Sequence, residues 1–240
     1  MSVSRRRVWA IVRKELAEYR RNRSVIGGMA VLPLVFVIQP LVAVLALASD
    51  AARPLGEGHV LLYLLGIPAL VPITVAAYSV AAERQQGTLE PALGTPIRGE
   101  EFLLGKALAA LIPSLVIAYA VFAIYLAVVG IFGQPAVMAA LVRGPDLLAQ
   151  VVFTPLLALW SVWVGIAVST RSSDVRVAQQ LGYLASLPPV FVVVLMAFGV
   201  IPATPSVAIG GAALLVALDV FGWRFTSRLF DRERLITGTS

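Results

Sequence analysis

Six long apolar stretches constrain the fold of this 240-residue chain more than any other feature of its sequence. A helix needs about 20 predominantly apolar residues to cross the hydrocarbon core of a bilayer. The composition agrees, because only 13% of the residues are charged, whereas a soluble domain has about 25%. We therefore predict an all-α integral membrane protein with six transmembrane helices, over residues 25–48, 60–82, 107–129, 147–168, 178–200 and 207–225.

The distribution of basic residues predicts how these helices are oriented. Lysine and arginine concentrate in the cytoplasmic connections of membrane proteins. If all six stretches span the membrane, alternate compartments contain 17 and two of the 19 basic residues. We therefore expect both termini and the connection over residues 83–106 to be cytoplasmic. This bias also explains the net positive charge, so we expect no nucleic-acid partner.

Residues 5–23, which precede the first apolar stretch, have an apolar face and a basic face. Apolar side chains recur there at helical spacing, at Val8, Ile11, Val12, Leu16 and Tyr19. Arg13 and Lys14 are among the basic residues that largely occupy the other side. We predict an amphipathic helix in the cytoplasmic membrane interface, with Trp9 near the lipid headgroups. The alternative is a basic anchor that only fixes the topology.

Few polar groups interrupt the apolar stretches. Asp219 is the one clear ionisable residue, and an ion pair with Arg224 or Arg228 explains it more simply than a functional acid does. Four glutamines favour hydrogen bonds between helices over the lining of a path: Gln39, Gln150, Gln179 and Gln180. With so little internal charge, the chain is not expected to couple transport to protons or sodium.

Two consecutive prolines, Pro188 and Pro189, interrupt the fifth apolar stretch. Each proline lacks a backbone donor and tends to kink a helix. The pair could divide the helix into two halves, as in a re-entrant turn, or could produce a simple kink. The sequence leaves both interpretations open.

Residues suited to catalysis or to metal binding are scarce. The chain has no cysteine, which excludes disulfides and thiol chemistry, and it has one histidine, His59. A single histidine without an acidic cluster does not make a metal site. An intramembrane serine protease would need a G-x-S-x-G motif and a histidine within the membrane, and neither is present. We expect no catalytic residue and no metal site.

The polar segment over residues 83–106 is dense in charge and in turn residues. Thr88 is suited to cap a short helix, and Pro91 fits the first turn of such a helix. Leu89 and Leu93 are four residues apart and would share one face of it. We expect this helix to lie below the membrane and to offer that face to a partner's groove.

The end of this segment does not form a nucleotide site. Phosphate-binding loops follow the pattern G-x-x-x-x-G-K-[ST]. In this chain five residues separate Gly99 from Gly105, and Ala107 follows Lys106, so the spacing and the hydroxyl are both wrong. No nucleotide-binding motif is therefore found, and the chain is not expected to be an enzyme.

The motif in this segment resembles that of a known family. One set of residues follows the pattern E-x-x-x-G-T-L-E, then a threonine-proline pair and G-K, between the second and third spans: Glu83, Gly87, Thr88, Leu89, Glu90, Thr95, Pro96, Gly105 and Lys106. Together with Lys14-Glu15-Leu16 and the six spans, this pattern resembles the membrane subunit of an ABC exporter of the type-2 permease family.

The resemblance implies a single permease domain over residues 1–240 in the plasma membrane, the inner membrane of a bacterial cell. A second permease copy or a sister permease would complete the pore in the lipid bilayer. Two separate ABC ATPase subunits would bind ATP and magnesium, with neither bound by this chain. They would dock on coupling residues in the 83–106 loop, namely Glu83, Gly87, Thr88, Leu89, Glu90, Leu93, Thr95 and Pro96. The N-terminal helix would connect at the membrane interface through Trp9, Arg13, Lys14 and Glu15.

The apolar interior predicts an amphipathic substrate, such as a drug, a lipid or a lipid-linked product. A second function class uses the same loop differently. In that alternative the chain is a membrane anchor or sensor that recruits a soluble partner without transporting anything.

Overall fold

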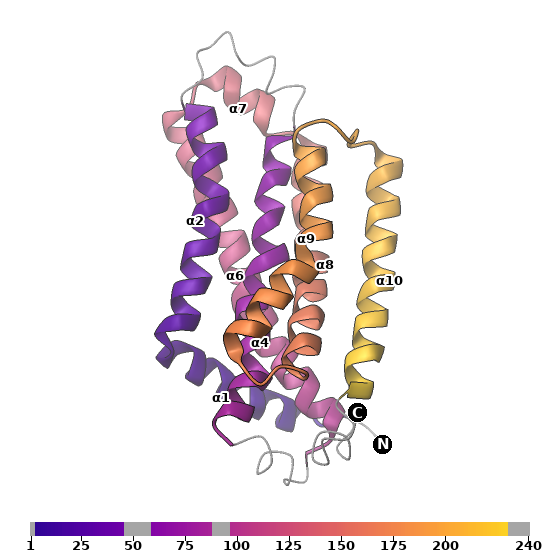
Figure 1. Ribbon diagram of the computed structural model, residues 1–240. Helices are drawn as coiled ribbons and strands as arrows, with labels where there is room; N and C mark the ends of the chain where they lie inside the picture. The colour runs from indigo at the N-terminus through magenta and orange to yellow at the C-terminus, as the bar shows by residue number, and fades with distance from the viewer. Residues whose placement is uncertain (1–2, 46–58, 88–96, 230–240) are drawn as a thin grey trace.

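The computed structural model describes residues 3–45, 59–87 and 97–229. These residues form helices and contain no strand (Figure 1): α1 (Arg5–Arg21), α2 (Arg23–Leu45), η2 (Val60–Leu65), α4 (Gly66–Gln85), α6 (Gly99–Phe132), α7 (Pro135–Leu141), α8 (Gly144–Ser169), α9 (Val175–Ala197) and α10 (Pro205–Leu229). Six helical segments are long and apolar enough to cross a membrane. The predicted all-α class with six spanning helices is confirmed.

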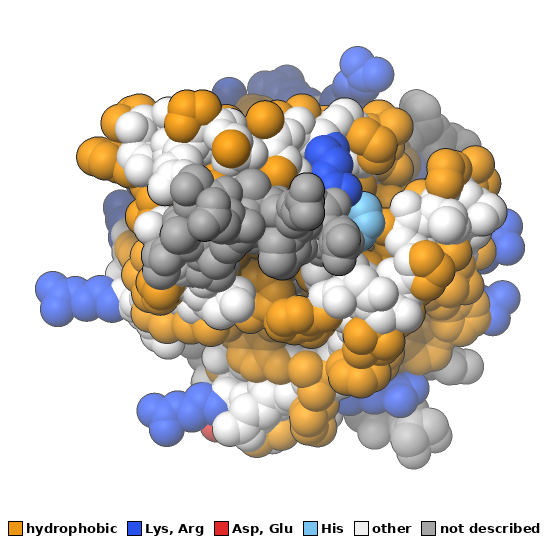
Figure 2. All heavy atoms as spheres, turned by 90° about the horizontal axis from the view of Figure 1, so that it is seen from above, with side chains coloured by type: hydrophobic (Ala, Val, Ile, Leu, Met, Phe, Trp, Pro, Cys, Tyr) orange, Lys and Arg blue, Asp and Glu red, His pale blue; other side chains and the backbone are white. Residues whose placement is uncertain are grey.

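Helix α1 lies across one end of the bundle, while α7 lies at the other (Figure 1). We refer to these as the α1 end and the α7 end. Viewed from the α7 end, hydrophobic side chains cover much of the surface, and lysine and arginine side chains project around its rim (Figure 2). The apolar face of α1 is buried against protein, because Ile11 and Val12 join a cluster with Phe102 and Leu103 of α6.

Helix α4 is the central helix of the bundle. In the most apolar part of the span that α4 forms together with η2, 89% of the residues are buried, far more than in any other spanning helix that the structure describes. Small residues permit close packing of α4 on α8: a Cβ atom on Gly165 would lie 2.7 Å from the Cβ of Ala76. Small residues commonly allow membrane helices to approach in this way.

Helix α6 extends the predicted third span, and helix α9 decides between the two interpretations of its proline pair. Helix α6 begins at Gly99, within the segment expected to be a connection, and its 34 residues extend over about 51 Å. It begins there because the Arg98 backbone N–H donates to the Glu101 carboxylate at 3.2 Å. Helix α9 continues through Pro188 and Pro189 as one element, which excludes a re-entrant break. Membrane helices tolerate such prolines where neighbouring groups satisfy the freed backbone.

Candidate coupling site

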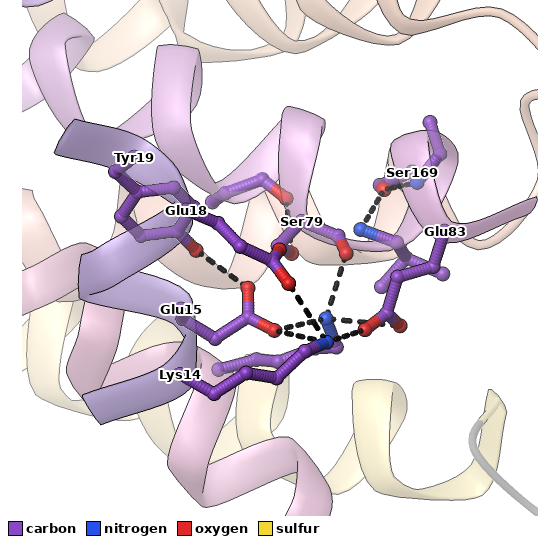
Figure 3. Close-up of polar contacts among 11 residues, drawn as sticks. Lys14, Glu15, Glu18, Tyr19, Ser79, Glu83 and Ser169 are labelled. Atoms are coloured by element: carbon purple, nitrogen blue, oxygen red, sulfur yellow. Dashed lines mark hydrogen bonds and ion pairs between the residues drawn. The ribbon is translucent and has the colours of Figure 1, made fainter. Parts of the chain in front are cut away.

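Four charged side chains from three helices form a chain of ion pairs at the α1 end of the bundle, and Figure 3 shows this region in close-up. Lys14 and Glu15 come from α1, Glu83 from the end of α4, and Lys106 from the start of α6. Three of these residues are buried, with exposed fractions of 0% for Lys106, 1% for Glu15 and 4% for Glu83. We call these four residues the coupling cluster.

The ammonium group of Lys106 is surrounded by oxygen atoms. It donates to the backbone carbonyl of Ser79 at 2.7 Å and to Glu15 Oε1 at 3.0 Å. Glu83 Oε2 lies 3.1 Å away, and the ring of Phe102 is 4.9 Å from the ammonium nitrogen. A lysine has three N–H donors, and three oxygens are within reach. The cost of burying this charge is therefore offset locally.

Glu83 connects both lysines of the chain. Its Oε1 accepts a hydrogen bond from Lys14 at 2.7 Å, while Oε2 faces Lys106. Partial burial on its own would lower the pKa of Lys14, but the hydrogen bond to Glu83 and the nearby Glu15 and Glu18 carboxylates outweigh that effect and raise the pKa above its ordinary value. On the far side, Tyr19 donates to Glu15 Oε2 at 3.0 Å. Charges of opposite sign thus alternate across three helices.

Gly105, which directly precedes the buried Lys106, allows α1 and α6 to pack closely together. A Cβ atom at this position would lie 2.6 Å from the side chain of Ile11 in α1. The missing side chain lets α1 lie against α6 at this point, and the next residue, Lys106, binds Glu15 of the same helix. The glycine-lysine pair is therefore a helix-packing device rather than part of a phosphate loop.

The end of α4 is also attached to the turn between α8 and α9. The guanidinium of Arg84 donates to the Thr170 carbonyl at 2.8 Å, and the Gln85 amide donates to Asp174 at 3.4 Å. Gly87 then leaves the helix with φ of +67°, a conformation that favours glycine. The end of α4, which leads into residues 88–96, is thus attached to α1 and α6 through Glu83 and to the turn between α8 and α9 through Arg84 and Gln85.

The structure brings some predicted site residues together and leaves others apart. Lys14 and Glu15 join Glu83, whereas Trp9 is 47% exposed and Arg13 is exposed. The carboxylate of Glu83 faces α1 and α6, so it is not available to a docking partner in this arrangement. Six predicted residues lie outside the described residues: Thr88, Leu89, Glu90, Leu93, Thr95 and Pro96.

The roles of Tyr19, Ser79 and Lys106 were not predicted from the sequence. A signal for Lys106 was present, because the chain has only two lysines against 17 arginines. A buried site ringed by three oxygens suits a compact ammonium better than a planar guanidinium. Both lysines converge on Glu83, and their rarity could have indicated a shared site.

The polar groups of the spanning helices are placed unequally. Gln179 donates to the Thr74 carbonyl at 3.0 Å and joins α9 to α4, whereas Gln39 is exposed on α2. The expected ion pair of Asp219 is wrong: both carboxylate oxygens are buried without a partner in the part of the chain that the structure describes. At about 100° per residue, Arg224 and Arg228 lie roughly 140° and 180° around α10 from Asp219, which explains why neither reaches it.

The chain matches a known family over most of its length. The family described as ABC-2 family transporter protein matches residues 9–227. No curated protein matches the chain. The matched range contains the whole coupling cluster, the first five helices that are able to span a membrane, and the sixth except for its last two residues.

Proposed function

This chain belongs to the ABC-2 transporter family as a multi-pass membrane permease subunit, and we propose that it forms the translocation path of an exporter driven by a separate ATPase. Subunits of this family are not themselves catalytic, and the family in general works with ABC ATPases. Two ATPase subunits would bind and hydrolyse ATP with magnesium, and a second permease copy or sister permease would complete the path.

We assign the α1 end to the cytoplasm on the positive-inside rule. Helix α1 carries seven basic residues within 17 positions. With this orientation both termini are cytoplasmic, and the chain between α4 and α6 faces the partner ATPase. The exposed residues of α1 would then lie at the membrane interface, with Trp9 at headgroup depth.

One observation carries the coupling proposal. The coupling cluster joins the most buried helix, α4, to α1 and α6 at the point where α4 gives way to the 88–96 segment. A force on that segment would reach Glu83 within two turns and would pass through charged contacts into two other helices. Glu83 therefore acts as the inner link, and the contact with the ATPase falls to the segment itself, including Leu89, Glu90 and Leu93.

The substrate that best fits this interior is amphipathic, such as a drug, a lipid or a lipid-linked product. Outward-facing positions of α2 and α9 are apolar and exposed, for example Val31 and Leu34 on α2 and Leu184 on α9. In the bilayer these faces would meet lipid or the second permease. Export is the direction that we propose.

Two variants separate docking from coupling. Glu90→Lys should weaken co-purification of the partner ATPase, because it reverses a charge in the segment that we propose as the ATPase contact. Glu83→Gln should preserve co-purification but lower ATP-driven movement of a fluorescent amphipathic cation in proteoliposomes roughly tenfold. Glu100→Gln removes an exposed carboxylate nearby and is the matched control, with expected activity near that of the unaltered protein.

The same assay tests the anchor or sensor alternative. A recruiting anchor would bind the ATPase, yet ATP would drive no movement of the probe and the permease would not change the rate of ATP hydrolysis. A transporter would show both effects. Normal ATP-driven movement in Glu83→Gln would remove Glu83 from the coupling path.

A further inference from the structure

Asp219 is a buried carboxylate for which the fold provides no counter-charge. It is 6% exposed, and neither oxygen has a hydrogen-bond partner among the described residues. Arg224 and Arg228 lie on other faces of α10, and the guanidinium of Arg171 lies over the ring of Phe225 at 5.8 Å. An unpaired charge within a membrane segment is costly and commonly marks function.

The rest of the same helix face is well packed. Four buried residues form a stripe along α10: Leu215, Asp219, Gly222 and Thr226. Thr226 donates its hydroxyl to the Gly222 carbonyl, and Gly222 fits closely against the side chain of Trp163 in α8. Packing of α10 on α8 therefore has no need for an acid at position 219.

The way in which α8 and α10 are aligned places Asp219 beside tryptophan residues. Two contacts fix how α8 and α10 run beside each other, Phe153 with Gly211 and Trp163 with Gly222. The helices are thus parallel with a nearly constant offset, and Asp219 lies level with Trp160. The indole N–H groups of Trp160 and Trp163 are buried and also without a partner in the described part of the chain.

A third tryptophan side chain lies at the same interface between α8 and α10. Trp223 of α10 meets Trp163 edge-to-face, with 5.5 Å between the ring centroids. The interface between α8 and α10 therefore contains three of the four tryptophans in the chain and one unpaired carboxylate. Aromatic faces and a carboxylate both attract organic cations, and the carboxylate repels anions of the same size.

We propose that the interface between α8 and α10 at Asp219 binds lipophilic organic cations, that is, an apolar body with one ammonium or phosphonium charge. This inference rests on the proposed function, because it names the substrate class of that transporter. Helix α10 stands at the edge of the bundle (Figure 1), and its outer residues Val216, Val220 and Phe221 are exposed. A cation dissolved in the bilayer would reach Asp219 by displacing α10 from α8.

Binding of tetraphenylphosphonium tests the site directly. The permease alone, in phosphatidylcholine nanodiscs, should bind this cation in equilibrium dialysis and should bind tetraphenylborate, an anion of the same shape, far more weakly. Asp219→Asn should weaken cation binding roughly tenfold or more, about 1.4 kcal/mol for each factor of ten. Asp174→Asn, the matched control, removes an exposed acid at the α9 N-cap, where asparagine caps equally well, and should bind like the unaltered protein.

The outcomes separate this site from the proposed function. Equal binding of the cation and the anion, no binding of the cation, or unchanged binding in Asp219→Asn would each overturn the site. A thermal unfolding curve for Asp219→Asn at least as stable as that of the unaltered protein shows that lost binding is not lost folding. Because no ATPase is present, failure here leaves ATP-driven transport untouched, and failure of ATP-driven transport leaves the measured binding in place.

Discussion

Lys106 and Asp219 are both buried charges of this bundle, and their surroundings are opposite. Lys106 has three oxygens within 3.1 Å and an aromatic ring at 4.9 Å, whereas Asp219 has no partner among the described residues. The fold thus satisfies one buried charge completely and leaves another unsatisfied. A satisfied charge can join helices, and its removal should damage the structure. An unsatisfied charge costs stability, so we infer that it is kept for a ligand.

The largest effect is expected from Lys106→Met. This change would leave Glu15 and Glu83 buried close together, with Lys14 as the cation that remains in the coupling cluster. Breaking a buried ion pair typically costs about 3–5 kcal/mol, and we expect a loss of that size. Unfolding of the purified protein by sodium dodecyl sulfate in mixed micelles measures it.

A triple variant checks that the loss comes from stranded charge. When Lys106→Met is combined with Glu15→Gln and Glu83→Gln, no buried carboxylate is left in the coupling cluster, so much of the stability should return. If the triple variant is as unstable as the single one, the stability lost in Lys106→Met comes from altered packing and not from unpaired carboxylates. The contrast with Asp219 would then lose its meaning.

Gly105→Ala is expected to have the next largest effect. The added Cβ atom would lie 2.6 Å from Ile11, so α1 would have to shift, and overpacking of this kind costs about 1–3 kcal/mol. Gly27→Ala is the control, because nothing lies within 4 Å of the added atom there. Measured in the same micelles, Gly27→Ala should be neutral or stabilising. Equal losses in both variants would show that α1 is not seated through Gly105.

The sequence predicted the helices of this protein far better than it predicted its coupling cluster. Six apolar stretches of sufficient length indicated the spanning helices, because the bilayer leaves little choice of structure for them. The periodicity of Val8, Ile11 and Val12 likewise indicated α1. Helix α6 starts at Gly99, earlier than the predicted span over residues 107–129, since charges such as Glu101 and Lys106 are not expected inside an apolar stretch until their partners are known.

The coupling cluster depends on contacts between residues far apart in the chain. Glu15 and Lys106 are separated by 91 positions, and no periodicity indicates that they meet. For the same reason the sequence suggested the wrong partners for Asp219. Proximity along the chain favours Arg224 and Arg228 as ion-pair partners, although the helical turn directs both side chains to other faces of α10.

Asp219→Asn tests the other side of the comparison, and its effect should have the opposite sign. Replacing an unpaired buried carboxylate with a neutral amide should raise stability by roughly 1–2 kcal/mol. Under the same conditions Glu15→Gln, which removes a carboxylate bound to Lys106 and Tyr19, should lower stability. If both variants are destabilised alike, Asp219 has a structural partner in the folded protein and is not kept unpaired for a ligand.

Lys14→Met should have the smallest effect, because the Lys14 side chain is 49% exposed and solvent screens its ion pairs. Pairs of this kind contribute about 0.2–1 kcal/mol. The pKa of Lys14 is raised above its ordinary value of 10.5 by Glu83, Glu15 and Glu18 despite partial burial, so its contribution is fully present below that ordinary value and is lost only as the pH rises through the raised one. The stability difference between Lys14→Met and the unaltered protein should therefore be the same at about pH 6 and about pH 9. A difference that shrinks over this range would mean that the Lys14 ammonium loses its proton there, and that the coupling cluster holds its outer lysine less firmly than the distances indicate.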